Sequence, residues 1–115
     1  MLRTFGSSEP EIALRAYLYL IGAVAFRRSV TYAELAWQIK RGGPNPLAKP
    51  LELLTRWCKT NGLPALTSLV VQEATGLPAP GFTAVSRSEI PDEQKRVWDY
   101  DWFAILPPTV EELKT

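Results

Sequence analysis

The feature that most constrains the fold is an N-terminal segment that is apolar on more than one face of a helix. Its apolar residues form two rows at helical spacing, Ile12-Ala16-Tyr19-Ala23 and Leu14-Leu18-Ile21-Ala25. A surface helix carries one apolar stripe, whereas a helix that is apolar this far around packs on several sides. Because 115 residues have room for one hydrophobic core, we expect this helix at its centre. Ser7 or Ser8 is a suitable N-cap, with Pro10 in the first turn.

A second helix and a polar turn are expected next. Residues 31–34, Thr-Tyr-Ala-Glu, match a capping box, in which the Thr hydroxyl and the Glu carboxylate each bind a backbone N–H at the helix start. This helix should run to about Lys40 and bury three apolar residues, Leu35, Ala36 and Ile39. Residues 42–46, Gly-Gly-Pro-Asn-Pro, are typical of a turn.

A third helix should follow the turn. Because proline is costly inside a helix, we expect the helix to begin near Lys49, with Pro50 in its first turn. Asn61-Gly62 should end it, since glycine readily adopts a left-handed conformation. Its apolar row consists of Leu47, Leu51, Leu54 and Cys58.

The rest of the chain predicts a small β-hairpin and a last helix. Residues 67–73, Thr-Ser-Leu-Val-Val-Gln-Glu, have the composition of a strand. Residues 82–85 are expected to return as a second strand after a loop rich in Gly and Pro. An acidic helix should open at Ser88 or Pro91 and run to about Trp102, before a short tail. The expected fold class is therefore mainly α with a small β-hairpin.

Charge is distributed unevenly along the chain. Residues 27–59 carry seven basic side chains against two acidic ones, whereas residues 60–115 carry four basic against eight acidic. The net charge of +1 hides this division. A basic region on helical patterns is typical of a nucleic-acid interface. The acidic, aromatic end suits either a protein partner or a solvated cap.

Few residues are available for catalysis or metal binding. The chain has no histidine and a single cysteine, Cys58, which argues against His-assisted nucleophilic catalysis and the usual zinc sites. Cys58 lies in an apolar row, so we expect a buried structural thiol. Asp99 and Asp101 flank Tyr100, but no further acidic residue or lysine completes a nuclease-like metal site. We expect no enzymatic activity, no metal and no cofactor.

The same features predict a cytoplasmic protein. The longest apolar run is far shorter than the roughly 20 residues that a bilayer requires. Glu9 and Glu11 precede it, which is unlike a signal peptide. One cysteine cannot form an internal disulfide.

The order of elements, with three short motifs, resembles the winged helix-turn-helix domain of alkylguanine-DNA alkyltransferases and their alkyltransferase-like relatives. Residues 30–36 (Val-Thr-Tyr-Ala-Glu-Leu-Ala) resemble the opening of the family's helix-turn-helix. Residues 61–66 (Asn-Gly-Leu-Pro-Ala-Leu) resemble the stretch after its recognition helix. Residues 68–71 (Ser-Leu-Val-Val), with glycines beyond, occupy the place of its reactive segment. The resemblance, which covers about residues 30–82, implies a helix-turn-helix at about 31–61 and a strand and wing at about 67–85. With the length of the chain and its acidic aromatic segment at about 88–106, this predicts one winged-helix-like domain, 1–115.

The chain departs from this family at the reactive positions. Ser68, Leu69 and Val70 fall where the family has its alkyl-accepting cysteine, its histidine and its arginine. A serine without a neighbouring base is a poor nucleophile, so the resemblance implies DNA binding without alkyl transfer. Tyr32 matches the family's helix-opening tyrosine, which sits at the DNA backbone near the flipped nucleotide. Lys49 lies near the family's helix-borne arginine.

These observations predict two alternative sites. The first is a DNA-binding face with phosphate contacts from the basic helix and its turn; its candidate residues are Tyr32, Arg41, Lys49, Arg56 and Lys59. The second is a face for a protein partner, as in an adaptor, inhibitor or immunity protein; its candidates are Trp98, Tyr100 and Trp102. Trp and Tyr are enriched in interface hot spots, but the same aromatics can instead lock the C-terminal segment onto the first helix.

Overall fold

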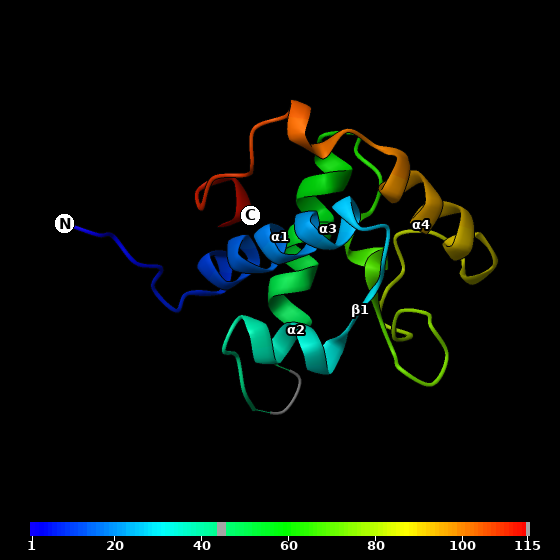
Figure 1. Ribbon diagram of the computed structural model, residues 1–115, viewed down its shortest axis with the longest axis horizontal. Coiled ribbons are helices and arrows are strands. Elements are labelled where there is room, and N and C mark those ends of the chain that lie inside the picture. The colour runs from blue at the N-terminus through cyan, green and yellow to red at the C-terminus, as the bar shows by residue number, and fades with distance from the viewer. Residues whose placement is uncertain (44–45, 115) are drawn as a thin grey trace.

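The computed structural model describes residues 1–43 and 46–114, and within them the chain is mainly helical (Figure 1). The α-helices are α1 (Glu9–Ala25), α2 (Tyr32–Gln38), α3 (Ala48–Thr60) and α4 (Ile90–Asp99). The strands are β1 (Val30–Thr31) and β2 (Val70–Val71). Four short 3-10 helices are also present in the described residues: η1 (Leu66–Leu69), η2 (Arg87–Glu89), η3 (Trp102–Ala104) and η4 (Glu112–Lys114).

The central position predicted for the first helix is confirmed. α1 crosses the middle of the molecule and contacts α2, α3, α4, η1 and η4 (Figure 1). Its buried residues are Ile12, Ala13, Ala16, Tyr17, Leu20, Ile21, Ala23 and Val24. Leu18, by contrast, is exposed. Ser8 caps the helix through a capping box with Glu11, as one of the two expected serines.

The second and third helices also form where the sequence predicts them. Thr31 Oγ1 accepts a hydrogen bond from the backbone N–H of Glu34. The Glu34 carboxylate does not complete the box; it accepts a hydrogen bond from Tyr19 and pairs with Arg28. Gly62 adopts the expected left-handed conformation, with φ of +66°. In the predicted turn between these helices, Pro44 and Asn45 lie outside the described residues.

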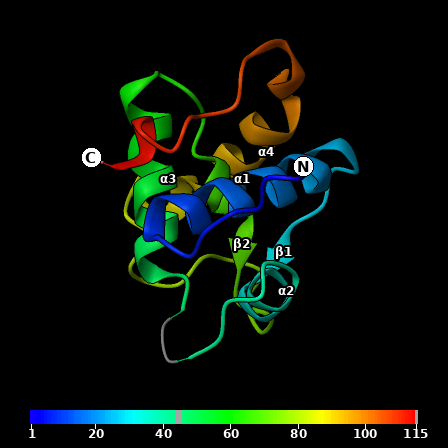
Figure 2. The same ribbon diagram turned by 90° about the vertical axis from the view of Figure 1, so that its left-hand side faces the viewer.

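The predicted β-hairpin is wrong. Residues 66–69 form the 3-10 helix η1, and only β2 is extended. β2 pairs in parallel with β1, so that Val30 faces Val70 and Thr31 faces Val71 (Figure 2). Residues 82–85 form no strand. Part of the reason is that Tyr32 and Arg87 bind the backbone of Pro78 and Ala79 just before this segment, which ties the chain to α2 and η2 and not to β2.

The C-terminal part differs from the expectation in its boundaries. The last α-helix, α4, ends at Asp99, and Trp102 lies in the separate 3-10 helix η3. The segment expected as a tail after Pro107 contains η4, whose Leu113 is buried among the core residues. η4 packs against both α1 and α3, so this segment contributes to the core.

Candidate functional site

A pocket of about 860 Å³ lies between α2, α3 and the loop of residues 72–84. One face of α3 forms a wall, with residues at helical spacing: Ala48, Leu51, Glu52, Thr55, Arg56 and Lys59. α2 contributes Tyr32, Ala33 and Ala36, and the loop contributes Phe82 and its neighbours. The opposite side of α3 enters the core through Leu54 and Cys58. Helical periodicity thus divides α3 into a core face and a pocket face.

Two hydroxyl groups and a phenol give this largely apolar pocket its polarity. Thr55 Oγ1 donates to the carbonyl oxygen of Leu51 and also contacts Thr67 Oγ1. Because the Thr55 proton is used on Leu51, Thr67 must donate to Thr55, which leaves the lone pairs of Thr67 as acceptors. Tyr32 Oη accepts the N–H of Ala79 at 2.8 Å, so its own proton remains available. Thr67 and Tyr32 therefore offer one acceptor and one donor to a ligand, in addition to the charged side chains of the lining.

The loop wall of the pocket is held by bonds at two consecutive residues, Pro78 and Ala79. Tyr32 binds the N–H of Ala79, as described above. The Arg87 guanidinium donates to the carbonyl oxygens of Ala79 at 3.2 Å and Pro78 at 2.8 Å. These bonds connect α2, the loop and η2, and they fix the loop beside α3.

The basic residues predicted to bind DNA are only partly brought together. Arg56 and Lys59 line the pocket with Tyr32, whereas Arg41 pairs with Glu9 at the start of α1. Lys49 lies on the exposed side of α3 beside the pocket.

The charge of this face is lower than the sequence count indicates. Glu52 Oε1 lies 2.6 Å from Arg56, and Glu52 Oε2 lies 3.8 Å from Lys49. One carboxylate therefore partly neutralises two of the predicted cations. Among the described residues, Lys59 is in no ion pair with an acidic side chain. Exposed pairs of this kind contribute only about 0–1 kcal/mol, so they exchange readily with a competing anion.

The aromatic residues proposed as a partner face mainly hold the C-terminal segment in place. Trp102 is 2% exposed, and its indole N–H donates to the Val97 carbonyl oxygen at 2.8 Å. The Trp98 indole N–H donates to the carbonyl oxygen of Arg28 at 3.1 Å, just beyond α1. Tyr100 packs edge-on against Trp102, with ring centroids 4.9 Å apart.

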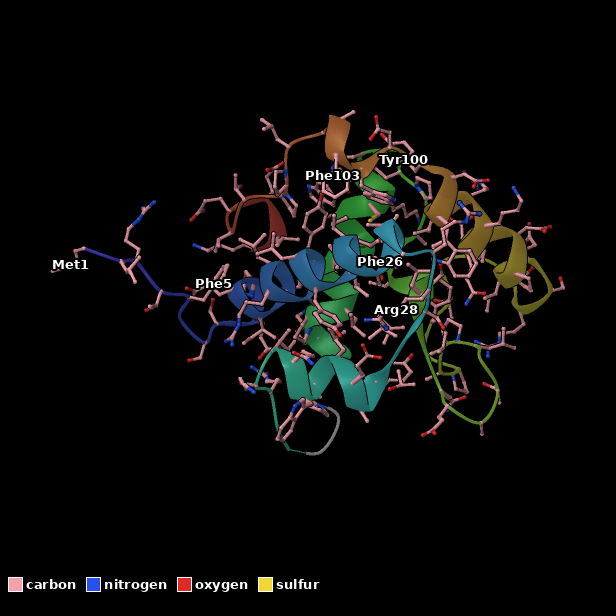
Figure 3. All side chains as sticks on the ribbon, viewed as in Figure 1. Met1, Phe5, Phe26, Arg28, Tyr100 and Phe103 are labelled. Carbon is pink, nitrogen blue, oxygen red and sulfur yellow. The ribbon has the colours of Figure 1, made fainter. Side chains whose placement is uncertain are left out.

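Other apolar side chains are exposed at this end of the molecule. Phe103 is 77% exposed and Leu106 is 87% exposed. Figure 3 shows Tyr100 and Phe103 near each other at the upper edge, beyond α3. Sequence reasoning did not separate these exposed residues from the buried aromatics, because the segment has no single helical period.

The residues at the family's reactive positions lie in the protein interior. Ser68, Leu69 and Val70 are all fully buried, and none of them lines the pocket. The Ser68 hydroxyl has no hydrogen-bond partner among the described residues. Burial raises the pKa of the Cys58 thiol to about 11, which disfavours the reactive thiolate.

Two polar side chains of α4 hold this interior turn. Glu93 Oε2 accepts the N–H of Ala65 at 2.7 Å, and Gln94 Nε2 donates to the Ser68 carbonyl oxygen at 2.9 Å. Both side chains are buried. They satisfy backbone groups that a strand would otherwise pair, which is why residues 66–69 form a 3-10 helix in spite of their strand-like composition.

The sequence interpretation missed several pocket residues. Thr55 and Thr67 are separated by 12 positions and meet only in three dimensions. Ala48, Glu52 and Thr55 share a helical face that adjoins the recognised apolar row at Leu47 and Leu51, and that spacing was the available signal. The loop residues carry no periodic pattern that indicates a pocket wall.

Searches for other kinds of site and for related proteins add no assignment. Within residues 1–43 and 46–114, no group of three His, Cys, Asp or Glu residues is placed to hold a metal ion. No helix in the same ranges combines the length and apolar character needed to cross a membrane. The chain matches no protein-family model, no curated protein and no solved structure.

Proposed function

We propose that this protein binds DNA without catalysing a reaction, and that the pocket face of α2 and α3 is its DNA-binding face. The observation that carries the proposal is the convergence of Tyr32, Arg56 and Lys59 on one cavity. The resemblance to alkyltransferase-like proteins over about residues 30–82 points to the same face. In this proposal α2 and α3 form a helix-turn-helix in which α3 is the recognition helix.

The dimensions and chemistry of the pocket support a nucleotide as its occupant. Its volume of about 860 Å³ falls within the roughly 300–1,000 Å³ typical of ligand pockets. Leu51 and Phe82 supply apolar contact, while Tyr32 and Thr67 offer a donor and an acceptor. Arg56 and Lys59 at the same cavity suit the phosphate that accompanies a base. An extrahelical nucleotide of DNA combines all these properties.

The ion pairs on α3 make a sharp test of this proposal possible. Glu52 competes with phosphate for both Arg56 and Lys49, since it pairs with each of them. Glu52→Gln should therefore raise DNA affinity while leaving the helix intact. A structural role for the same ion pairs predicts no gain in affinity.

The experiment is a DNA titration at several salt concentrations, with circular dichroism to verify folding. Each lost phosphate contact should lower the log–log salt slope by about 0.9. Replacing Lys49, Arg56 and Lys59 together with Ala should thus lower the slope by nearly three. Lys95→Ala, an exposed cation on α4, is the matched control and should leave the slope unchanged.

The proposal fails if the wild type binds neither duplex nor single-stranded DNA at about 50 mM salt, where phosphate contacts are strong. It also fails if Lys95→Ala lowers the slope as much as Lys59→Ala. In that case any binding reflects general charge and not the pocket face.

The absence of catalysis is part of the proposal and has its own measurement. Ser68 is buried away from the pocket, and Cys58 has a raised pKa. We expect no covalent transfer when the protein is incubated with duplex DNA that contains alkylated guanine. Intact-mass spectrometry should show the unmodified mass; a stoichiometric gain on Ser68 or Cys58 would contradict this expectation.

A protein-interaction module is the second candidate function, favoured by the exposed Phe103 and Leu106 at the C-terminal end. On this alternative the protein is an adaptor, inhibitor or immunity protein that uses the acidic aromatic end. It predicts that replacing Phe103 and Leu106 with Ser abolishes binding to an isolated partner, whereas Glu52→Gln has no effect. The reverse pattern, with DNA binding sensitive to Glu52, rejects it.

A further inference from the structure

An exposed tryptophan lies next to the pocket. Trp37 on α2 is 72% exposed, one helical turn beyond Ala33 and adjacent to Ala36, both of which line the pocket. Residues four apart lie on the same side of a helix, so the indole extends the α2 wall outward. Trp57 and Trp102, in contrast, are 7% and 2% exposed.

A lysine with a left-handed backbone conformation lies over one face of this indole, which leaves the other face open to a base. Lys40 Nζ lies 4.8 Å from the centroid of the Trp37 ring. Lys40 has φ of +59°, a left-handed conformation that usually favours glycine at a helix end. The N–H of Arg41 donates to the Ala36 carbonyl oxygen at 2.9 Å, which closes the end of α2 around Lys40.

The end of α1 has the same geometry, and there the basic residue has a clear role. Arg27 has φ of +51°, and the N–H of Arg28 donates to the Ala23 carbonyl oxygen at 3.1 Å. Arg27 pairs with Asp99 at 2.9 Å and lies over the Trp98 ring. Lys40 is in no ion pair with an acidic side chain among the described residues, so its charge is available to an external anion.

We propose that Trp37 and Lys40 form a stacking site for an unpaired nucleobase and its phosphate, beside the pocket. This inference rests on the proposed DNA-binding function and extends it to single-stranded DNA. An indole face stacks on any base once the base leaves the duplex, and a neighbouring cation binds the backbone. A continuous duplex keeps its bases stacked on one another, and hence it cannot use the indole in this way.

The test is a comparison of an oligothymidylate with a blunt duplex of equal length. Trp37→Ala should weaken binding of the oligothymidylate by about 5- to 150-fold, the range measured for stacking on one aromatic side chain. It should change duplex binding less than about twofold. Phe26→Ala is the matched control, because Phe26 is an aromatic of similar exposure, at 81%, and should change neither affinity.

Fluorescence provides a readout that follows Trp37 itself. Oligothymidylate should quench the exposed indole of the wild type, and the quenching should disappear in Trp37→Phe. Lys40→Gly fits the backbone conformation and removes the side chain with its cation. It should retain the fold and lower the single-strand salt slope by about 0.7.

The outcomes separate this inference from the proposed function. If the wild type binds DNA but Trp37→Ala and Phe26→Ala reduce single-strand binding equally, the stacking site is rejected and the DNA-binding function stands. The same holds if Trp37→Ala weakens duplex and oligothymidylate equally. If the wild type binds no DNA at all, both proposals are rejected.

Discussion

The buried Glu93 side chain should contribute more to stability than any exposed ion pair of the chain. Glu93 is 6% exposed. One of its oxygens accepts the Ala65 N–H at 2.7 Å, and the other accepts from Arg96, also at 2.7 Å. It links α4 to the turn that leads into η1, where Thr67 faces the pocket. The effect of replacing it can be estimated from these two contacts.

The two contacts differ in their expected contributions. Glu93→Ala leaves the buried Ala65 N–H without its acceptor, which costs about 1–3 kcal/mol. It also removes buried methylene groups, each contributing about 0.8 kcal/mol. The Arg96 side chain is 65% exposed, so this ion pair contributes at most about 0.5–1 kcal/mol. We expect Glu93→Ala to lower the free energy of unfolding by about 3 kcal/mol.

Urea unfolding of three variants measures this difference. Glu93→Gln retains an oxygen acceptor and the shape, and should cost about 1 kcal/mol, while Arg96→Ala should cost about 0.5 kcal/mol. The urea midpoint should fall most for Glu93→Ala, less for Glu93→Gln and least for Arg96→Ala. The slope of the unfolding free energy against urea should stay unchanged, since a changed slope signals a change in the denatured or native ensemble. If Arg96→Ala costs as much as Glu93→Ala, the exposed ion pair is the stabilising contact and the reasoning is refuted.

Three further predictions concern buried or charged groups of the fold. Cys58, with its pKa raised to about 11 by burial, should react with a disulfide reagent at about pH 8 only as fast as the protein opens; rapid labelling of the native protein would contradict its burial. Arg28 holds the pKa of the Glu34 carboxyl below its ordinary value of 4.5. A carboxyl whose pKa is lower in the folded than in the unfolded protein stabilises the fold above the unfolded pKa, and this contribution is lost as the pH falls through the folded pKa. Glu34→Gln should therefore make the free energy of unfolding less dependent on pH below about pH 4.5. Urea unfolding at several pH values measures this. Ser68→Ala removes a buried hydroxyl that has no partner in the described residues and should leave the melting temperature unchanged or raise it; a fall of more than about 4 °C, corresponding to roughly 1 kcal/mol, would indicate that the hydroxyl is satisfied.

The helices could be predicted because their signals are local. The Ser8 and Thr31 hydroxyls each accept a hydrogen bond from the N–H three residues later, and the residue types at those spacings are visible in the sequence. Gly62 ends α3 with the left-handed conformation that glycine favours. Each of these features depends on a few neighbouring residues, so no knowledge of the tertiary structure was needed.

The sheet and the C-terminal segment could not be predicted, since they depend on distant contacts. Val70 pairs with Val30 although α2 and α3 lie between them in the sequence. Strands of two residues are too short to show the alternation of polar and apolar residues that would reveal such a pairing. η1 owes its form to Glu93 and Gln94, more than 20 residues later. Leu113 follows two prolines and an acidic stretch, a context typical of a tail, yet it is 1% exposed.

The candidate site shows the same division between local and distant information. The pairs of Glu52 with Lys49 and Arg56 have spacings of three and four residues, so their neutralising effect could be read from the helix alone. The pair of Arg41 with Glu9 joins residues 32 positions apart and could not. Counting charges along the chain therefore overestimated the positive field of the face that we propose to bind DNA.

This lower charge changes what kind of DNA binding the face can support. If each of the seven basic residues in 27–59 were free to bind phosphate, affinity would come mainly from counterion release and would not depend on DNA structure. Arg27, Arg28, Arg41, Lys49 and Arg56 are instead in ion pairs. Lys49 and Arg56 contact phosphate only where it displaces Glu52, so a larger share of the binding falls to groups that require an unstacked base: the pocket with Tyr32 and Thr67, and the exposed indole of Trp37. Weak binding to continuous duplex and stronger binding to DNA with unpaired bases is thus the pattern that these charges and shapes favour together.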